Sequence, residues 1–457
     1  MMKTEYTEND GFLQRDSVEH KEYAEVYSTN GREVDEKDGA DLLEKVLSRD
    51  NLNRAYKRVK ANKGASGVDG MTVNEAGSWL KEHKGELLEK IRNGQYKPSP
   101  VRRVEIPKDN GGVRKLGIPT VIDRIIQQAI AQVLTPIYEP KFSDGSYGYR
   151  PNRSAKDAIA KARDYADKGY QYAVCLDLSK YFDTLNHELL MNMLRQDIHD
   201  KRLIDLIKKY LKSGVMKNGV RHKTEEGSPQ GGNLSPLLAN IYLDKFEFEG
   251  RGVKVIRYAD DIVLLAKSKR ASERLLETST RYLEKKLKLK VNTEKSCVVS
   301  VYSIRNFKFL GFAMGKNRKE HISEFIQKAK DKLRRLTSRS QGRKLDYVLH
   351  NIKVYMQGWL NYYGIAEMKS TMEDWNRWLR RRIRMYIWKQ WKKPKTRVEN
   401  LKKLGMSKWQ AYRNGNTRKG YWAVAGSRTL NHTITNERLA RRGYYDISKA
   451  YKSMHSI

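Results

Sequence analysis

The sequence is poor in cysteine and has no long apolar run, and each absence excludes a class of protein. Its 457 residues include only two cysteines, Cys175 and Cys297. Two cysteines cannot build a disulfide framework or a cysteine-based zinc module, so a reduced, intracellular protein is expected. The longest strongly apolar run, residues 262–266, has the length of a buried strand. It falls far short of the roughly 18–20 apolar residues of a membrane-spanning helix.

The chain is also short of acidic residues. Lys and Arg number 91 against 54 Asp and Glu, which gives a formal charge of +37 and a pI near 9.9. Such a chain repels itself unless a polyanion neutralises it, and nucleic acid is the expected partner. An anionic membrane is the alternative, but no spanning segment supports it. Met1 leads into an acidic, polar segment and not a signal peptide, so secretion is not expected.

The charge is unevenly distributed. Residues 1–40 contain 11 acids against 5 bases, which is typical of a mobile acidic leader. Residues 321–457 contain 32 bases against 9 acids and seven of the eight tryptophans. Bases interleaved with aromatic residues suit a surface that neutralises phosphates and stacks on nucleobases. A solvated basic face around an aromatic core remains the alternative.

Hydrophobic periodicity predicts an α+β core followed by an all-helical region. The predicted helices cover residues 41–61, 72–92, 121–138, 154–168, 186–196, 201–212, 233–248, 323–337, 345–363, 371–392 and 397–404. The predicted strands cover residues 101–107, 172–178, 253–258, 261–266, 296–301 and 307–313.

Carboxylates interrupt two of the predicted strand regions. Asp177 ends the apolar run 173–176, and Asp260 and Asp261 separate two β-rich runs. The second pattern predicts a hairpin with the aspartate pair at its turn. Neighbouring carboxylates at the edge of an apolar sheet repel each other unless a cation lies between them.

Oxygen ligands of this kind favour Mg²⁺ over zinc. Two such ions about 3.5–4 Å apart can activate an attacking 3′-hydroxyl and stabilise a leaving pyrophosphate. The alternative is that the aspartate pair only forms a turn and that Asp177 only ends a strand. The basic charge of the chain favours the catalytic interpretation.

Residues 258–261, Tyr-Ala-Asp-Asp, resemble the box of that sequence in reverse transcriptases, and Asp177 is similar to the first catalytic aspartate of their palm. Further blocks resemble group II intron-encoded reverse transcriptase/maturase proteins, in the order of that family. They lie at residues 106–108, 111–114, 117–120, 146–151, 227–240, 289–296 and 309–312. The resemblance covers residues 41–457.

The resemblance implies roles for individual residues. The implied catalytic residues are Asp177, Asp260 and Asp261, and the implied metal ligands are these three with the backbone carbonyl of Leu178. The implied nucleotide contacts are Lys108, Arg114, Phe182, Gln230 and Lys295. The implied nucleic-acid contacts are Arg380, Arg381, Arg382, Arg384, Arg418 and Lys419. The implied cofactors are two Mg²⁺ ions, with Mn²⁺ as a substitute, and the substrates are deoxynucleoside triphosphates.

Some of these roles have plain structural alternatives. Phe182 is similar to the bulky side chain that favours deoxynucleotides by crowding the 2′ position of the sugar, but it could also be core packing. Lys108 and Arg114 resemble a triphosphate clamp, but they could also belong to a solvated basic loop. Lys295 lies in a turn where lysine is often a surface residue.

The implied fold is a right-hand polymerase with appended domains. Residues 1–40 form the leader, 41–100 an N-terminal extension, 101–316 the fingers and palm, 317–395 a helical thumb or maturase domain, and 396–457 a basic DNA-binding domain. No His-Asn-His endonuclease pattern is present, which resembles the compact group IIC type. A bacterial cytosol or nucleoid is the expected location.

The resemblance implies an RNA-directed DNA polymerase that binds its group II intron RNA, assists splicing and reverse-transcribes the RNA during target-primed mobility. The partners would be intron RNA, RNA template and a DNA primer or target, with no membrane; the oligomeric state stays open. One alternative is a domesticated reverse transcriptase that serves host defence. Another is a non-catalytic splicing maturase, although all three aspartates are present.

Overall fold

The computed structural model describes residues 41–107, 112–217, 219–246, 252–303, 305–315, 320–321 and 323–455. The acidic leader predicted for residues 1–40 lies outside them. The chain divides into two compact units, with the boundary between Leu310 and Gly311. The first unit mixes helices and sheets and the second is mainly helical, so the predicted α+β class is confirmed.

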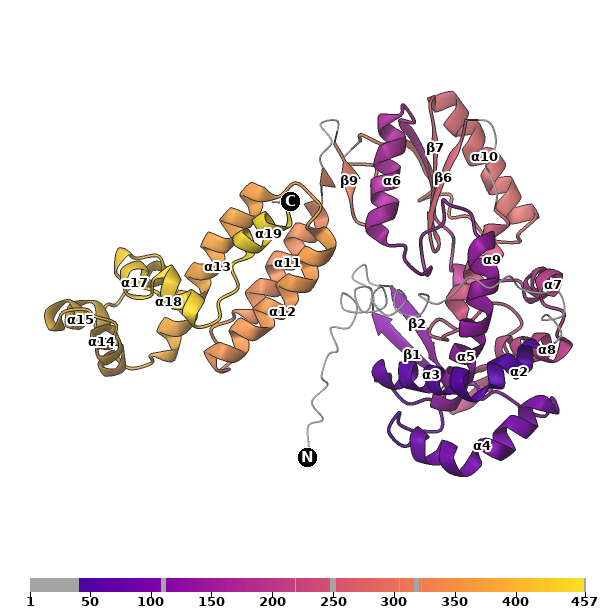
Figure 1. Ribbon diagram of the computed structural model, residues 1–457. Coiled ribbons are helices and arrows are strands. Elements are labelled where there is room, and N and C mark those ends of the chain that lie inside the picture. Colours follow the sequence, from indigo (N-terminus) through magenta and orange to yellow (C-terminus); the bar gives the residue numbers. More distant parts are fainter. Residues whose placement is uncertain are drawn as a thin grey trace. The chain divides into compact units, whose positions relative to one another are not determined.

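Three helices open the described part of the first unit: α2 (Leu42–Leu47), α3 (Arg49–Ala61) and α4 (Ala76–Arg92). The leucines and the valine of α2 and the side chains of Ala55 and Val59 in α3 are buried, and both helices pack against α5 (Val121–Tyr138) (Figure 1). The sequence predicted a single helix over 41–61. Ser48 interrupts it because its backbone is extended, with φ −59° and ψ 145°.

A four-stranded sheet, here called the fingers sheet, has the order β2-β1-β4-β5. Its strands are β1 (Val101–Pro107), β2 (Val113–Ile118), β4 (Val215–Lys217) and β5 (Val220–His222). β1 pairs antiparallel with β2 and parallel with β4, which comes about a hundred residues later. Only β1 was predicted. β2 and β5 are largely exposed, so they lack the apolar alternation of a half-buried strand, and β4 has only three residues, too few to show such a pattern.

A second four-stranded sheet, here called the palm sheet, is antiparallel with the order β6-β7-β3-β8. Its strands are β3 (Tyr172–Leu176), β6 (Lys254–Tyr258), β7 (Asp261–Ala266) and β8 (Cys297–Ser300). The predicted hairpin is confirmed as β6–β7. Five consecutive residues of β7 are buried, because α6 (Ala155–Asp167) and α10 (Lys269–Lys285) cover parts of the sheet.

The two cysteines, far apart in sequence, are directly opposite each other in the β3–β8 ladder. Burial, followed by the neighbouring Cys297 and Asp261, raises the pKa of the Cys175 thiol to about 12. Cys175 is therefore an uncharged, weakly nucleophilic packing residue near neutral pH.

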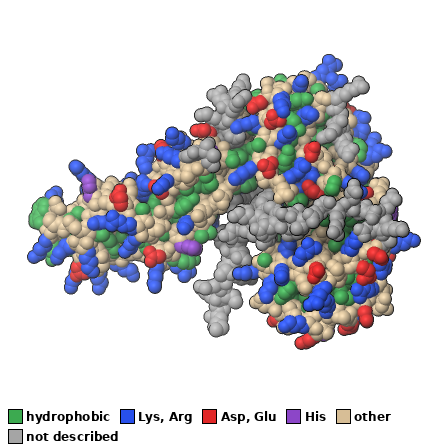
Figure 2. Space-filling view, viewed as in Figure 1, with side chains coloured by type: hydrophobic (Ala, Val, Ile, Leu, Met, Phe, Trp, Pro, Cys, Tyr) green, Lys and Arg blue, Asp and Glu red, His purple; other side chains and the backbone are tan. Residues whose placement is uncertain are grey.

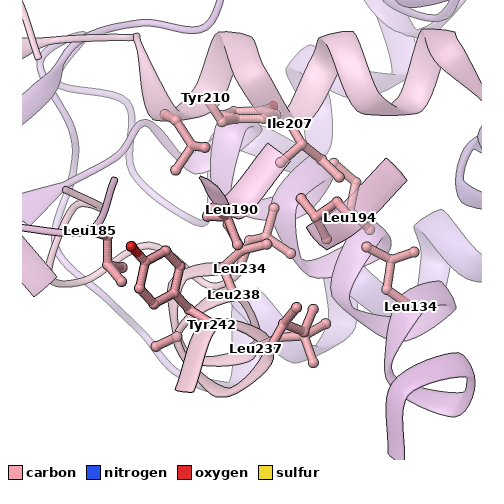
Figure 3. Close-up of a cluster of buried hydrophobic side chains, with 14 of the residues drawn as sticks. Leu134, Leu185, Leu190, Leu194, Ile207, Tyr210, Leu234, Leu237, Leu238 and Tyr242 are labelled. Carbon is pink, nitrogen blue, oxygen red and sulfur yellow. The ribbon is translucent and has the colours of Figure 1, made fainter. Parts of the chain in front are cut away.

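The hydrophobic core of the first unit joins helices from distant parts of the chain. Figure 3 shows apolar and aromatic side chains of α7 (His187–Asp197), α8 (Lys201–Leu211) and α9 (Ser235–Asp244) in one cluster with Leu134 of α5. Tyr242 is fully buried in this cluster and donates a hydrogen bond to the carbonyl of Leu287, at 2.6 Å. The short 3-10 helices η2 (Glu139–Lys141) and η3 (Tyr181–Asp183) complete the unit.

The predicted strand over 307–313 is wrong for most of its length. Only Ala313–Met314 (β9) forms a strand, paired with Glu320–His321 (β10). Phe307, Phe309 and Phe312 are nevertheless buried. A short apolar run predicts burial but cannot distinguish a strand from an irregular buried segment.

The second unit consists mainly of helices packed around aromatic residues. Its helices are α11 (Ser323–Leu336), α12 (Leu345–Tyr363), α13 (Lys369–Gln390), α14 (Pro394–Lys403), α15 (Lys408–Gly415), α16 (Tyr421–Ala425), α17 (Arg428–Thr433), α18 (Asn436–Arg441) and α19 (Ile447–Met454). Trp359, Trp375 and Trp388 are buried, as expected for core residues. No helix in the described ranges is both long and apolar enough to cross a membrane.

Candidate active site

The palm sheet brings the three predicted catalytic aspartates to one edge. The β3–β7 ladder ends with the pair Leu176 and Ile262. Asp177 and Asp261 each lie one residue beyond that pair, so they emerge at the same end of the two central strands. Asp260 is adjacent to Asp261 in the β6–β7 turn. The carboxylates that the sequence separates by more than eighty residues are therefore grouped.

A tight turn presents Asp260 and Asp261. Tyr258 and Asp261 form the last pair of the β6–β7 ladder, so only Ala259 and Asp260 connect the strands. Ala259 has a φ of +56°, a left-handed conformation that costs a non-glycine residue about 1–2 kcal/mol. Strain of this kind persists only where the surrounding structure imposes it.

The aspartates at this edge are electrostatically coupled. Asp260 and Asp261 reach solvent, and the Asp177 side chain is 42% exposed, but protein atoms still crowd the first two carboxyl groups. Lost hydration, followed by the charges of Asp260 and Asp177, raises the pKa of Asp261 to about 6. Lost hydration also raises the pKa of Asp260, and the Arg114 charge partly opposes this. The edge therefore favours a cation.

Lys295 and Ser296 support Asp177 from the segment before β8. The Lys295 Nζ lies 3.8 Å from Oδ2 of Asp177, and both side chains are largely solvated. The Asp177 backbone N–H donates to Oγ of Ser296 at 3.1 Å. Leu178 is buried and forms an isolated bridge with Val291. Ser296 is the last residue of the motif at 289–296, and the sequence alone did not predict a role for it.

The donor chemistry of this edge fits a hard divalent ion, because the donors are carboxylate oxygens. Within the described ranges, however, no three His, Cys, Asp or Glu side chains already converge as a metal-ligating group. The backbone brings the three aspartates to one edge, but their side chains do not converge on a single metal position.

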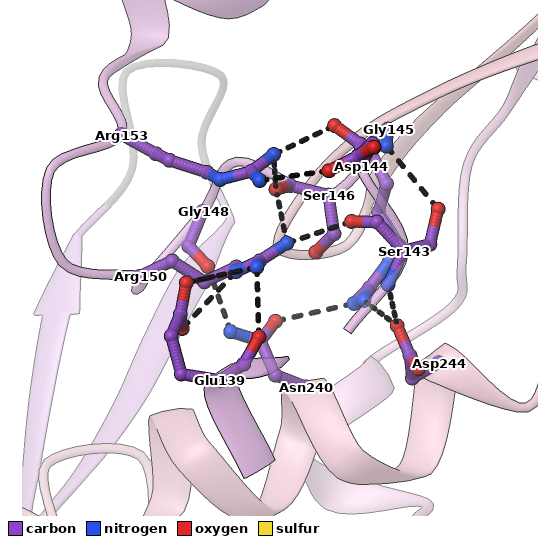
Figure 4. Close-up of polar contacts among 11 residues, drawn as sticks. Glu139, Ser143, Asp144, Gly145, Ser146, Gly148, Arg150, Arg153, Asn240 and Asp244 are labelled. Atoms are coloured by element: carbon purple, nitrogen blue, oxygen red, sulfur yellow. Dashed lines mark hydrogen bonds and ion pairs between the residues drawn. The ribbon is translucent and has the colours of Figure 1, made fainter. Parts of the chain in front are cut away.

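The segment 145–150 supports the aspartate turn. A Cβ added to Gly148 would lie 2.3 Å from the Ala259 nitrogen and 2.9 Å from the Tyr258 carbonyl carbon, so only glycine fits against this turn. The Asn240 side chain donates to the Gly148 carbonyl at 2.7 Å, as Figure 4 shows. Backbone hydrogen bonds of 2.8 Å also join Tyr147 and Gly145 to Arg257 of β6.

Two buried arginines complete this support. Arg150 is 3% exposed and donates to the Glu139 carboxylate and to the carbonyls of Ser143 and Ser146 (Figure 4). Arg257 is 4% exposed and donates to the Asn240 side chain at 3.1 Å. The motif at residues 146–151 resembles the family, and these contacts give it a structural role. It holds the backbone from which Asp260 projects.

Phe182 and Gln230 lie on two segments that touch. Phe182 is 8% exposed, and its carbonyl accepts a hydrogen bond of 2.7 Å from the Ser228 backbone. Gly227, with φ +85°, packs directly against the carbonyl of Asp183. The carbonyl of Gln230 accepts from the Gly117 backbone at 2.8 Å, which ties this loop to the fingers sheet. The predicted nucleotide contacts Phe182 and Gln230 are therefore connected through one loop.

The predicted triphosphate clamp is only partly described. Arg114 is exposed on β2, and its charge acts on Asp260. Lys108 lies outside the described residues. The clamp remains a prediction.

Comparison with known proteins identifies both units. Residues 106–314 match the family described as reverse transcriptase (RNA-dependent DNA polymerase), and residues 326–405 match the group II intron, maturase-specific domain. Protein YkfC of Escherichia coli is 34% identical over 322 residues, covering 61% of this chain and 84% of YkfC. The group II intron-encoded protein LtrA of Lactococcus lactis is 40% identical over 210 residues. The chain belongs to the group II intron reverse transcriptase and maturase family.

Coverage of the relatives differs. The LtrA match covers 45% of this chain and 35% of LtrA, so this chain spans about a third of that protein. A chain of a solved structure titled "Partial Cas6-RT-Cas1--Cas2 complex" is 25% identical, with a TM-score of 0.35, covering 53% of this chain and 42% of that one.

The four predicted nucleic-acid arginines of α13, in the maturase-specific domain, all have protein partners. Arg380 forms an ion pair of 2.5 Å with Asp446, and Arg381 stacks on Trp422 at 4.1 Å. Arg382 donates to Thr337 Oγ1 at 2.5 Å. Arg384 is 6% exposed and donates to the carbonyl of Ile434 at 2.9 Å. Burial makes Arg384 the least accessible of the four to a nucleic acid.

Residues beyond α13 are more accessible. Arg418 and Lys419 are exposed. Trp409 is 68% exposed, and the Arg413 guanidinium lies 5.3 Å from its ring. Figure 2 shows Lys and Arg side chains spread over the visible face of the helical unit. Sequence reasoning did not distinguish these exposed groups from the buried arginines, because residue type does not record burial.

Proposed function

We propose that this chain is an RNA-directed DNA polymerase with its active site at Asp177, Asp260 and Asp261. The main supporting observation is that β3 and the β6–β7 turn bring these carboxylates to one sheet edge. There, lost hydration, followed by the charges of Asp260 and Asp177, raises the pKa of Asp261 to about 6. An acidic edge in a strongly basic chain suits divalent cations and a polyanionic substrate.

The three aspartates and the Leu178 carbonyl would hold two Mg²⁺ ions, or Mn²⁺ in their place. When bound, such ions lower the barrier to in-line attack of a primer 3′-hydroxyl on a nucleoside triphosphate and to release of pyrophosphate. The protein's own contribution is placement: the two-residue turn and its support at Gly148 set the position of Asp260 and Asp261.

Other side chains would bind the deoxynucleoside triphosphate. Arg114 and Lys108 would neutralise its phosphates, and Lys295, beside Asp177, would lie near the leaving group. Phe182 would restrict the 2′ position of the sugar. Gln230 would lie against the nucleotide or template.

The maturase-specific match over 326–405 favours a second activity on RNA. We infer that the chain binds its group II intron RNA, assists splicing and then copies the RNA at a DNA target. Exposed basic residues, including Arg418 and Lys419, would supply phosphate contacts. Residues 396–457 would form the DNA-binding domain.

Primer extension tests the polymerase. An RNA template, a DNA primer, deoxynucleotides and Mg²⁺ would be given to the wild type, to Asp260→Asn and to Asp205→Asn. Asp205 is an exposed carboxylate on α8 and serves as the matched control. Extension by the wild type and by Asp205→Asn, and its loss in Asp260→Asn, is expected.

Three other results of these experiments would contradict or change the proposal. Tight RNA binding without extension on any primer–template would favour a non-catalytic splicing maturase. Extension that survives Asp260→Asn would refute the proposed site. Polymerase activity without any stimulation of intron splicing would favour a domesticated enzyme.

A further inference from the structure

His187 is a buried histidine at the start of α7, and the proposed polymerase mechanism gives it no role. It is 5% exposed, and its Nε2 lies 2.6 Å from the carbonyl oxygen of Gly227, a residue 40 positions later in the chain. A carbonyl only accepts hydrogen bonds, so Nε2 carries the proton and donates it. Nδ1 is buried and has no hydrogen-bond partner among the described residues. The ring therefore makes one hydrogen bond, to Gly227.

Gly227 is in turn bonded to the segment that carries Phe182. The Gly227 N–H donates to the Leu185 carbonyl at 2.8 Å, and the Ser228 N–H donates to the Phe182 carbonyl at 2.7 Å. Gly227 has a φ of +85°, and a Cβ added to it would lie 2.8 Å from the Phe182 carbonyl oxygen. Because the two segments fit this closely, a shift of Gly227 would displace the backbone of Phe182.

The loop that begins at Gly227 also carries Gln230, but its far end is restrained by other groups. The Ser235 hydroxyl donates to the Pro229 carbonyl at 2.9 Å. The Gln230 carbonyl accepts from the Gly117 backbone at 2.8 Å. The hydrogen bond from His187 therefore acts on the end of the loop that lies against Phe182, and loss of this bond should affect Phe182 first.

The surroundings of His187 favour a neutral ring. Burial lowers its pKa, the hydrogen bond to Gly227 partly opposes this, and the charges of Lys212 and Glu226 have smaller, opposite effects. Protonation would also leave a buried Nδ1–H without an acceptor, which is costly. The bond to Gly227 therefore comes from an uncharged donor, and a side-chain amide of the right length can replace it.

We propose that His187 is a positioning residue for sugar selection: its hydrogen bond to Gly227 holds Phe182 where this side chain restricts the 2′ position of the incoming nucleotide. The inference rests on the proposed function, which gives Phe182 that role. His187 acts through the backbone of residues 227–228 and does not contact the nucleotide. Loss of the bond should relax selection between sugars and leave primer extension in place.

The ratio of ribonucleotide to deoxynucleotide incorporation tests this role. His187→Leu keeps a similar volume but has no donor, and His187→Asn is a second variant whose amide is too short to reach Gly227. Both should raise the ratio on the order of threefold, less than Phe182→Ala does, because the restricting side chain is displaced and not removed. His187→Gln can place an N–H close to the position of Nε2, so it should keep the wild-type ratio.

A destabilised control separates positioning from general loss of packing. Ile207→Val changes a fully buried side chain of α8, in the cluster that Figure 3 shows. It should lower the melting temperature and keep the wild-type ratio. All variants are assayed at a temperature at which melting curves show them to be folded. A rise in Ile207→Val equal to that in His187→Leu would overturn the inference, because the ratio would then report stability alone.

The double variant Phe182→Ala/His187→Leu tests the route through Phe182. It should have the same ratio as Phe182→Ala alone, because His187 then has no bulky side chain left to position. A further rise in the double variant would overturn the inference. So would an unchanged ratio in His187→Leu beside a raised ratio in Phe182→Ala, and the role of Phe182 would survive.

Failure of the proposed function gives different results. Equal ratios in the wild type and Phe182→Ala would refute the role of Phe182, and the inference would fall with it. Absent wild-type extension would refute the polymerase assignment itself.

Discussion

At the scale of single residues, the candidate site depends on side chains that are held from several directions. Asp177 receives support from Ser296 and lies near Lys295. Asp260 follows Ala259, whose left-handed backbone requires outside support. The sequence predicted the aspartates because acidic residues inside apolar runs are unusual. It did not predict their supports, which lie far away along the chain.

Phe182 offers a residue-scale test of sugar selection. Phe182→Ala should raise the incorporation of ribonucleotides relative to deoxynucleotides, on the order of tenfold, because it removes bulk at the proposed 2′ position. Competitive single-nucleotide incorporation measures this ratio. Phe182→Leu keeps most of the side-chain volume, so its incorporation ratio should lie between those of the wild type and Phe182→Ala. If Phe182 is only core packing, its truncation would cost about 3–5 kcal/mol of stability and leave the ratio unchanged.

His187 should make stability depend on pH. It is 5% exposed, and burial lowers its pKa below the usual value near 6.5, although a 2.6 Å hydrogen bond to the Gly227 carbonyl partly opposes this. The unfolded chain therefore binds a proton at a higher pH than the folded chain does. Stability contributed by neutral His187 should be present above about pH 6.5 and be lost as the pH falls below it.

Thermal melting at about pH 7.5 and pH 5.5 checks this expectation for His187. His187→Gln should lose less stability on acidification than the wild type. His199→Gln, which changes an exposed histidine of the same unit, should behave as the wild type. An identical loss in all three proteins would contradict the assignment.

At the scale of elements, local pattern predicted most helices and the palm strands. The β6–β7 hairpin was predicted because two apolar, β-rich runs flank a turn. β2 and β5 were missed because their side chains are mostly exposed, and β4 because it has only three residues. The strand predicted over 307–313 was mostly wrong. Short or exposed strands form because a neighbouring strand is available to pair with them. That neighbour lies outside the short stretch of sequence from which a strand is predicted.

Gly148 provides an element-scale prediction. Gly148→Ala should reduce the extension rate by about 100-fold, because the added Cβ would force the 258–261 turn to shift by about 1 Å. Gly85→Ala is the control: it lies in α4 with nothing within 4 Å of the added atom. That change should preserve activity and stabilise the helix by about 0.5–1 kcal/mol. Steady-state extension and thermal melting separate the two effects, and normal extension by Gly148→Ala would contradict the proposed support.

At the scale of the whole molecule, charge governs the choice of partner. The net charge of +37 includes 32 bases against 9 acids in residues 321–457. The structure divides these bases into two kinds. Some, such as Arg384, stabilise the helical unit through internal hydrogen bonds, whereas Arg418 and Lys419 remain exposed. Formal charge alone therefore overstates the number of available phosphate contacts.

Affinity for a primer–template should still fall steeply with salt. Neutralised phosphates release condensed counterions, so 6–10 contacts would lower affinity by about 10³-fold or more between about 50 and about 200 mM salt. Fluorescence anisotropy titrations measure this dependence. An affinity that scarcely changes over that range would contradict electrostatic recognition.

The sequence by itself determined the chemistry: a basic chain with aspartates at the ends of apolar strands, in the order of motifs typical of group II intron reverse transcriptases. Those features are local, since composition and short-range pattern carry them. Only the tertiary structure decided that Gly148 supports the Ala259 turn, that Arg384 is buried, and that β4 joins β1 in the fingers sheet. Each depends on a contact between distant segments, and the packing that creates such a contact leaves no local pattern in the sequence.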